Sequence, residues 1–197
     1  MMFPEQGGSP AHYVRDLCLE IGQDPRIPEK FFKCISWFTG VDKMSFLGRG
    51  GIQLGYGGFS PLREPSFWNV PRSVTSLTIN TGAVTLVQVR DIMAQLPNLD
   101  NLAVSGSLAN VDRRKLLGIG TVLKGRFGGR LILRGTCDGG DIVNMLLEVP
   151  SGLHFTELEI YCSQDYLPSA VRLAEACCKT IVKLSHTVNL NCKSNSS

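Results

Sequence analysis

Seven cysteines offer the most chemistry in this chain of 197 residues. They are Cys18, Cys34, Cys137, Cys162, Cys177, Cys178 and Cys192. Their number is odd, and none form a C-x-x-C pair, the close spacing with which many zinc sites gather ligands. Most lie within apolar patterns, which favours small buried side chains in a reducing compartment. The adjacent Cys177 and Cys178 leave one alternative open, a small α/β enzyme with a cysteine nucleophile at an exposed helix end.

Other candidates for catalysis or cofactor binding carry weaker signals. Glu157 and Glu159 share a predicted strand face, and two carboxylates can act as acid and base, but no apolar neighbour would shift a pKa. The glycine-rich stretch "GRGGIQLGYGG" lacks the Lys-Ser/Thr pair of nucleotide-binding loops, so we expect a surface insertion. None of the three histidines has a companion spaced as a metal ligand. We therefore expect no enzymatic activity, no cofactor and no metal.

The composition indicates a folded, weakly basic chain. Apolar residues make up 43% and charged residues 19%, and the formal net charge is +3. Such apolar content excludes a disordered chain. One basic cluster leaves a second alternative open, an RNA-binding solenoid; it consists of Arg113, Arg114, Lys115, Lys124 and Arg126. A solvated helix face with its following loop explains this cluster better, so we do not expect a nucleic-acid partner.

The sequence carries no targeting or membrane-spanning signal. The N-terminal stretch "MMFPEQGGSPAHYVRD" has neither the basic nor the apolar region of a secretory signal. No apolar run approaches the ~18 residues that a spanning helix needs. We expect a cytoplasmic or nuclear protein that does not contact a membrane.

A recurring apolar pattern predicts the elements that position these residues. In "LPNLDNLAVSG" the apolar residues fall three apart and then two apart, as where a helix tail turns into a short strand. The same pattern occurs seven times, with spacings of 27, 33, 25, 29, 27 and 26 between its central residues. Those central residues are Leu17, Met44, Leu77, Leu102, Leu131, Leu158 and Leu184. Since leucine-rich repeats run about 20–29 residues, we predict an α/β leucine-rich-repeat solenoid of about seven irregular repeats, with a curved parallel sheet backed by helices.

The predicted organisation is a single domain. An N-terminal tail (1–13) precedes the repeat domain (14–190), which has a loop insertion near 48–66, and a polar tail (191–197) follows. Apolar periodicity predicts five helices, at 28–38, 85–96, 112–123, 140–149 and 168–181. Thr85 and Gln88 are predicted to form a capping box at the start of the helix at 85–96. Asp141 is predicted to be the N-cap of the helix at 140–149. The buried face of the last is predicted as Val171, Ala174, Cys178 and Ile181.

The strand residues between the buried positions should face outward and line one surface. On this surface we predict a protein-binding site centred on Arg130, Arg134, Glu157, Glu159 and Tyr161. Exposed strand faces of solenoids are extended and often bind partners. The alternative is a charged sheet face that has no partner.

Four stretches, "SVTSLTIN", "LPNLDNLAVSG", "GLHFTELEIY" and "AEACCKTIVKLS", resemble the leucine-rich-repeat region of fungal F-box-type proteins. The resemblance covers about residues 14–190. It implies a non-enzymatic module that recognises the substrate of a ubiquitin ligase. In that family an N-terminal F-box binds the adaptor of a cullin ligase, but too few residues precede the first predicted strand to hold one. We therefore expect an adaptor contact only if an F-box lies upstream.

Overall fold

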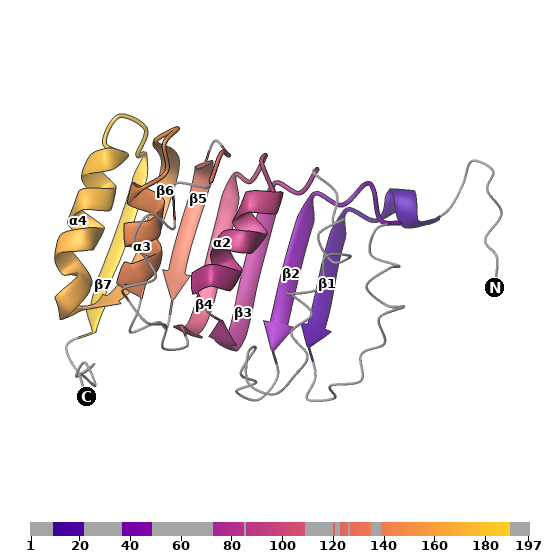
Figure 1. The fold of residues 1–197 in the computed structure, drawn as a ribbon, viewed down its shortest axis with the longest axis horizontal. Helices are drawn as coiled ribbons and strands as arrows, with labels where there is room; N and C mark the ends of the chain where they lie inside the picture. The colour runs from indigo at the N-terminus through magenta and orange to yellow at the C-terminus, as the bar shows by residue number, and fades with distance from the viewer. Residues whose placement is uncertain are drawn as a thin grey trace.

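The computed structural model describes residues 10–21, 37–48, 73–84, 86–108, 120, 123–125, 127–134 and 139–189. Within them, seven strands form one parallel sheet in the order of the chain, from β1 to β7 (Figure 1). The strands are β1 (Asp16–Ile21), β2 (Lys43–Gly48), β3 (Ser76–Val84), β4 (Asn101–Leu108), β5 (Phe127–Arg134), β6 (Leu153–Ser163) and β7 (Lys183–Asn189). The chain is therefore an α/β protein, as predicted.

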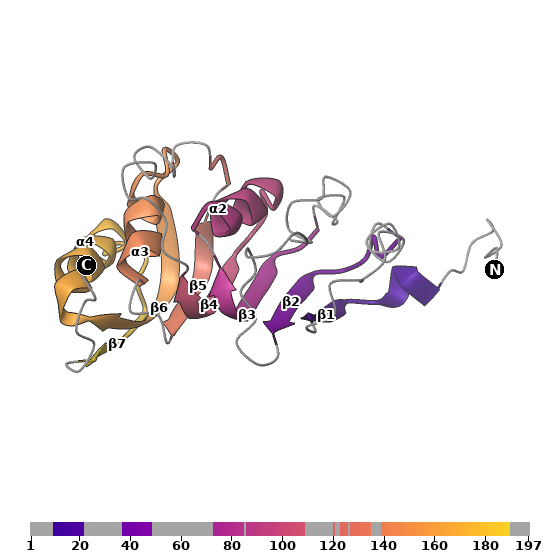
Figure 2. The ribbon, with the colours of Figure 1, turned by 60° about the horizontal axis from the view of Figure 1, so that its bottom comes forward.

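Three α-helices are described, and all lie on the same side of the sheet (Figure 2). They are α2 (Leu86–Gln95), α3 (Gly139–Leu147) and α4 (Leu167–Ala176). Two short 3-10 helices, η1 (Pro10–Tyr13) and η6 (Gln164–Tyr166), complete the described elements. We call the side of the sheet opposite these helices the open face. None of the described helices has the length and apolar composition that crossing a bilayer requires.

The strand register confirms the predicted alignment of the central residues. Each is paired with the next in the sheet, in the series Leu17, Met44, Leu77, Leu102, Leu131, Leu158 and Leu184. The five from Met44 to Leu158 are at most 2% exposed and form one continuous core with the apolar faces of the helices. Because side chains alternate along a strand, this register fixes which residues occupy the open face.

Backbone hydrogen bonds repeat where successive strands begin. The carbonyl oxygen just before a strand accepts two N–H groups at the start of the next strand, at 2.8–3.0 Å. The acceptors with their donors are Arg15 with Asp42 and Lys43, Asp42 with Thr75 and Ser76, and Thr75 with Asp100 and Asn101. The same contact thus recurs from β1 to β4.

The last strand departs from the prediction. Leu184 is predicted to be a core residue, but its side chain is 54% exposed. Its neighbour in the register, Leu158, is 1% exposed. The difference arises because β7 is an edge strand, and no described strand or helix beyond it covers this side of Leu184.

The predicted buried face of the last helix is wrong at Val171 and Cys178, whereas Ala174 and Ile181 pack partly against the core. Ala170, Leu173 and Cys177 are buried, whereas Val171 is 49% exposed and Cys178 is exposed. The helix ends at Ala176, so the helical period does not extend to Cys178 and Ile181. The prediction that the cysteines are buried is likewise wrong for Cys178, and for Cys18 on β1.

The predicted start of the fourth helix is also wrong. Asp141 lies within the first turn of α3, which begins at Gly139, and not at the N-cap. Gly140, in the first turn, packs directly against the Tyr166 ring, where a Cβ atom would collide with the ring. The buried residues predicted for this segment, Ile142, Leu146 and Val149, are confirmed.

The helix at 85–96 is confirmed as α2, with Leu86, Val89, Met93 and Leu96 all buried. Phe38, predicted to end a helix, lies outside any helix and packs partly against the core. Other predictions lie outside the described residues: the rest of the helix at 28–38, most of the helix at 112–123, the insertion after Gly48, the cap residue Thr85, Cys34, Cys137, Cys192 and the ends 1–9 and 191–197.

Candidate binding surface

Two neighbouring strands bring the five predicted site residues together on the open face. Arg130 and Arg134 come from β5, and Glu157, Glu159 and Tyr161 come from β6. In the register Arg130 is paired with Glu157, one row away from Glu159. We call Arg130, Arg134, Glu157 and Glu159 the Arg–Glu cluster.

Glu159 is the centre of the cluster. Its Oε2 accepts a hydrogen bond from the Arg130 guanidinium at 3.1 Å, and its Oε1 accepts one from Arg134 Nε at 2.8 Å and a second from an Arg134 terminal nitrogen. The Glu159 side chain is only 14% exposed, whereas Arg130 and Arg134 are 42% and 55% exposed. One carboxylate therefore holds two guanidinium groups that remain accessible to a partner.

A second carboxylate extends the cluster towards the sheet edge. Glu157 Oε2 lies 3.4 Å from Arg130 Nε and 3.9 Å from Lys183 Nζ on β7. Three cations thus surround two carboxylates, so this part of the open face carries an excess of positive charge. Ion pairs this exposed contribute about 0–1 kcal/mol each, so fold stability gains little from them.

Tyr161 adds an aromatic side chain beside the cluster. The guanidinium carbon of Arg134 lies 5.9 Å from the centre of the Tyr161 ring, within the range of a cation–π contact. The Tyr161 side chain is 37% exposed. Tyr161 and Glu159 therefore both contact the Arg134 guanidinium group. The side chains of Arg134 and Tyr161 nevertheless remain accessible to a partner.

The arginine contacts shift the pKa of the central carboxylate. The hydrogen bonds from Arg134, followed by its charge and the contact with Arg130, lower the pKa of Glu159 below its ordinary value of 4.5. A lowered folded-state pKa means that Glu159 stabilises the fold above pH ~4.5 and that this contribution is lost as pH falls through the folded-state pKa. The same contact raises the pKa of Arg134, which stays charged throughout.

We expect Glu159→Gln to lower the midpoint of thermal unfolding at pH 7, because it removes the charge that both guanidinium groups face. The deficit should shrink as the pH falls below about 4.5 and through the lowered pKa of Glu159, because the wild-type carboxylate then loses its charge. Melting curves of both proteins across this range measure the effect. Glu175→Gln on α4, which alters an exposed carboxylate outside the cluster, is the control and should give a small difference. An equal deficit at pH 3 and pH 7 contradicts the role of the charge.

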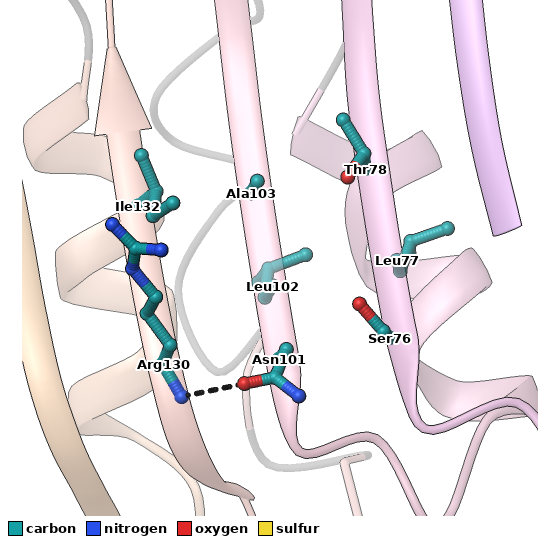
Figure 3. Close-up of a pocket in the computed structure, with 8 residues that line it drawn as sticks. All are labelled: Ser76, Leu77, Thr78, Asn101, Leu102, Ala103, Arg130 and Ile132. Carbon is teal, nitrogen blue, oxygen red and sulfur yellow. Dashed lines mark hydrogen bonds between the residues drawn. The ribbon is translucent and has the colours of Figure 1, made fainter. Parts of the chain in front are cut away.

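A hollow lies beside the cluster, across β3, β4 and β5. It has a volume of about 260 Å³, and the side chains around it on the open face are Ser76, Thr78, Asn101, Ala103, Arg130 and Ile132 (Figure 3). The hollow forms because small side chains occupy the open face of β3 and β4, whereas Arg130 and Ile132 rise on β5. It was not predicted from the sequence, although a run of small residues in the outward rows was its signal.

The cysteine pair separates into one buried and one exposed thiol. Cys177 is 1% exposed, and burial raises the pKa of its thiol, which disfavours the thiolate that a nucleophile needs. We expect a maleimide probe at pH 7 to label Cys178 and Cys18 rapidly in the folded protein, and Cys177 only after unfolding. Site-resolved mass spectrometry measures the three rates. Native labelling of Cys177 at the unfolded rate would contradict the burial.

The other candidate chemistry finds less support among the described residues. They contain no group of three His, Cys, Asp or Glu side chains placed to hold a metal ion. Of the basic cluster proposed for RNA, only the exposed Lys124 is described, and Arg113, Arg114, Lys115 and Arg126 lie outside the described residues.

Comparisons of the chain with protein-family models, with curated proteins and with solved structures found no match.

Proposed function

We propose that the chain is a non-enzymatic protein-interaction module, a leucine-rich-repeat solenoid whose open face binds a protein partner in the cytoplasm or nucleus. The observation that carries this proposal is the Arg–Glu cluster with Tyr161. Arginine and tyrosine are enriched among the residues that dominate binding energy at protein interfaces. Here Glu159 and Tyr161 hold an accessible Arg134 in place, so less side-chain entropy is lost on binding.

The recurrence of backbone contacts supports the repeat interpretation. Seven parallel strands follow in chain order, and their central residues are in register. The double hydrogen bond at the starts of β2, β3 and β4 is what a stack of similar units would give. Hydroxyl groups add contacts between successive strand entries, as from Thr156 Oγ1 to the Gly129 carbonyl at 3.0 Å and from Thr180 Oγ1 to the Phe155 carbonyl at 2.9 Å.

The resemblance to F-box-type proteins suggests a role for this module. The bound partner would be the substrate of a ubiquitin ligase, and an adaptor contact would require an F-box upstream of the repeats. Free thiols at Cys18, Cys177 and Cys178 fit a reducing compartment. No described feature favours the enzyme or the RNA-binding alternative over this proposal.

Affinity capture with matched variants tests the function. The tagged chain is incubated with extract of the cells that express it, and bound proteins are quantified by mass spectrometry. We expect at least one protein to be retained by the wild type but reduced about tenfold or more for Arg134→Ala/Tyr161→Ala. Arg172→Ala, which removes an exposed arginine from α4 on the other side of the sheet, should retain it.

A binding profile that is the same for all three proteins would contradict the proposal. Circular dichroism and melting curves of each variant exclude loss of the fold as the cause of lost binding. Both changes in the double variant affect side chains that are at least one-third exposed, so the fold should persist.

A further inference from the structure

The hollow on β3, β4 and β5 collects hydrogen-bond donors. Asn101 Oδ1 accepts the Arg130 backbone N–H at 3.0 Å, so its amide NH₂ group is left free beside Ser76 (Figure 3). The hydroxyl groups of Ser76 and Thr78 form no hydrogen bond with other described residues. Ser76 and Asn101, which are paired in the register, can therefore both donate to one group placed in the hollow, and Thr78 lies one row further along.

Cations flank the hollow on both sides. Lys43 on β2 is paired in the register with Ser76, and its exposed amine forms no ion pair with a described residue. Arg130 stands on the opposite side. The neighbouring carboxylates are Asp16, which lies beyond Lys43 on β1, Asp42 and Asp100, which directly precede Lys43 and Asn101 in the chain, and Glu157 and Glu159, which already bind arginines. The donors and the two flanking cations together favour a negatively charged acceptor.

The size of the hollow limits its occupant. Sites for drug-sized ligands and cofactors occupy about 300–1,000 Å³, and this hollow, at 260 Å³, falls below that range. It opens on the sheet face beside the Arg–Glu cluster, so a segment lying across that face can place one side chain in it. The hollow has room for a carboxylate-bearing side chain, which matches the donors and the charge.

We propose that the hollow is a subsite for an aspartate or glutamate side chain from an acidic segment of the protein partner. This inference rests on the proposed function, since it describes how the same open face selects its partner. The carboxylate accepts hydrogen bonds from the Ser76 hydroxyl and the Asn101 amide, which are paired in the register, and Lys43 and Arg130 supply charge from either side. The Arg–Glu cluster and Tyr161 contact neighbouring parts of the same segment.

A peptide selection with a charge-reversal variant tests the subsite. Random dodecapeptides displayed on phage are selected on the full chain, and enriched sequences are synthesised for affinity measurement. We expect enriched peptides to share an acidic residue at a fixed position, whose replacement by its amide weakens binding about tenfold or more. Asn101→Asp should weaken the acidic peptide similarly, because it replaces the donor amide by a carboxylate while keeping the acceptor for the Arg130 N–H. A lysine at the fixed peptide position should restore binding to this variant.

The matched control is Asn144→Asp on α3. It makes the same chemical change at an exposed asparagine on the helical side, where the acceptor for Ser169 Oγ at 2.9 Å is also kept, and it should leave affinity unchanged. Peptides that depend on Arg134 and Tyr161 but show no acidic preference and no effect of Asn101→Asp would overturn the subsite and leave the proposed function intact. Enrichment of no peptide that depends on the open face would overturn both.

Discussion

Replacing Leu102 with alanine is expected to lower the free energy of unfolding by about 2–5 kcal/mol. Leu102 lies near the start of β4, the middle strand of the sheet, is 1% exposed, and is paired in the register with Leu77 on one side and Leu131 on the other. The substitution removes buried apolar surface and leaves a cavity between closely packed neighbours that cannot all move inward. Urea denaturation of the two proteins measures the difference.

Leu184→Ala is the matched control for this prediction. Leu184 occupies the equivalent position in the last strand but is 54% exposed, so its truncation should cost less than about 1 kcal/mol. Equal losses for the two variants, or a loss below about half a kcal/mol at Leu102, would contradict the assignment of the continuous core.

Gly129→Ala is expected to destabilise the protein by about 2–4 kcal/mol, the second large effect. Gly129 has φ +63, which is costly for any residue with a Cβ atom, and that Cβ would lie 2.7 Å from the backbone oxygen of Asp100. A backbone atom cannot rotate away, so either β5 or the entry to β4 must shift. The strand register also shifts between Gly129 and Arg130, so this strain would reach the binding surface.

Gly152→Ala separates the two causes. Gly152 also has a positive φ, +74, but a Cβ there would meet no atom within 4 Å. In the same denaturation experiment, Gly152→Ala should lower the free energy of unfolding by about 1–2 kcal/mol, the cost of the positive φ alone. If Gly129→Ala lowers the free energy of unfolding no more than Gly152→Ala does, the predicted clash with the Asp100 backbone is contradicted.

The strand rows could be predicted because they depend on a strict local period. Spacing alone predicts Leu77, Leu102 and Leu131 in one row, and the register confirms it. The same alternation predicts Arg130 next to Glu157, with Glu159 one row away, and this too is confirmed. The proximity of the five site residues follows from this register, whereas their role in binding remains a prediction.

What could not be predicted depends on distant contacts. Nothing in the local pattern of 168–181 distinguishes the face with Ala170 and Leu173 from the face with Val171 and Ala174, since both are apolar. The packing of α4 against α3 and β6 selects the first. The exposure of Leu184 follows from the place of β7 at the sheet edge, which its own sequence does not encode.

The hollow could not be predicted either, because it too depends on contacts between residues that are distant in the sequence. Ser76, Thr78 and Ala103 are ordinary strand residues one by one, and only their placement side by side on two adjacent strands produces the space. The free donor of Asn101 depends on a contact with the backbone of the next strand. The small outward-facing side chains of Ser76, Thr78 and Ala103 are the sequence signal of this position.

Site-specific photo-cross-linking tests most directly the claim that the open face binds a protein partner. A photoreactive phenylalanine derivative is placed at Tyr161 on the open face or at Leu167 on α4, two positions that are both 37% exposed. Irradiation in the cells that express the chain is followed by mass spectrometry of the cross-linked proteins. We predict a discrete cross-linked protein from position 161 that is absent from position 167. The same cross-links from both positions, or a product from position 167 alone, would contradict the account.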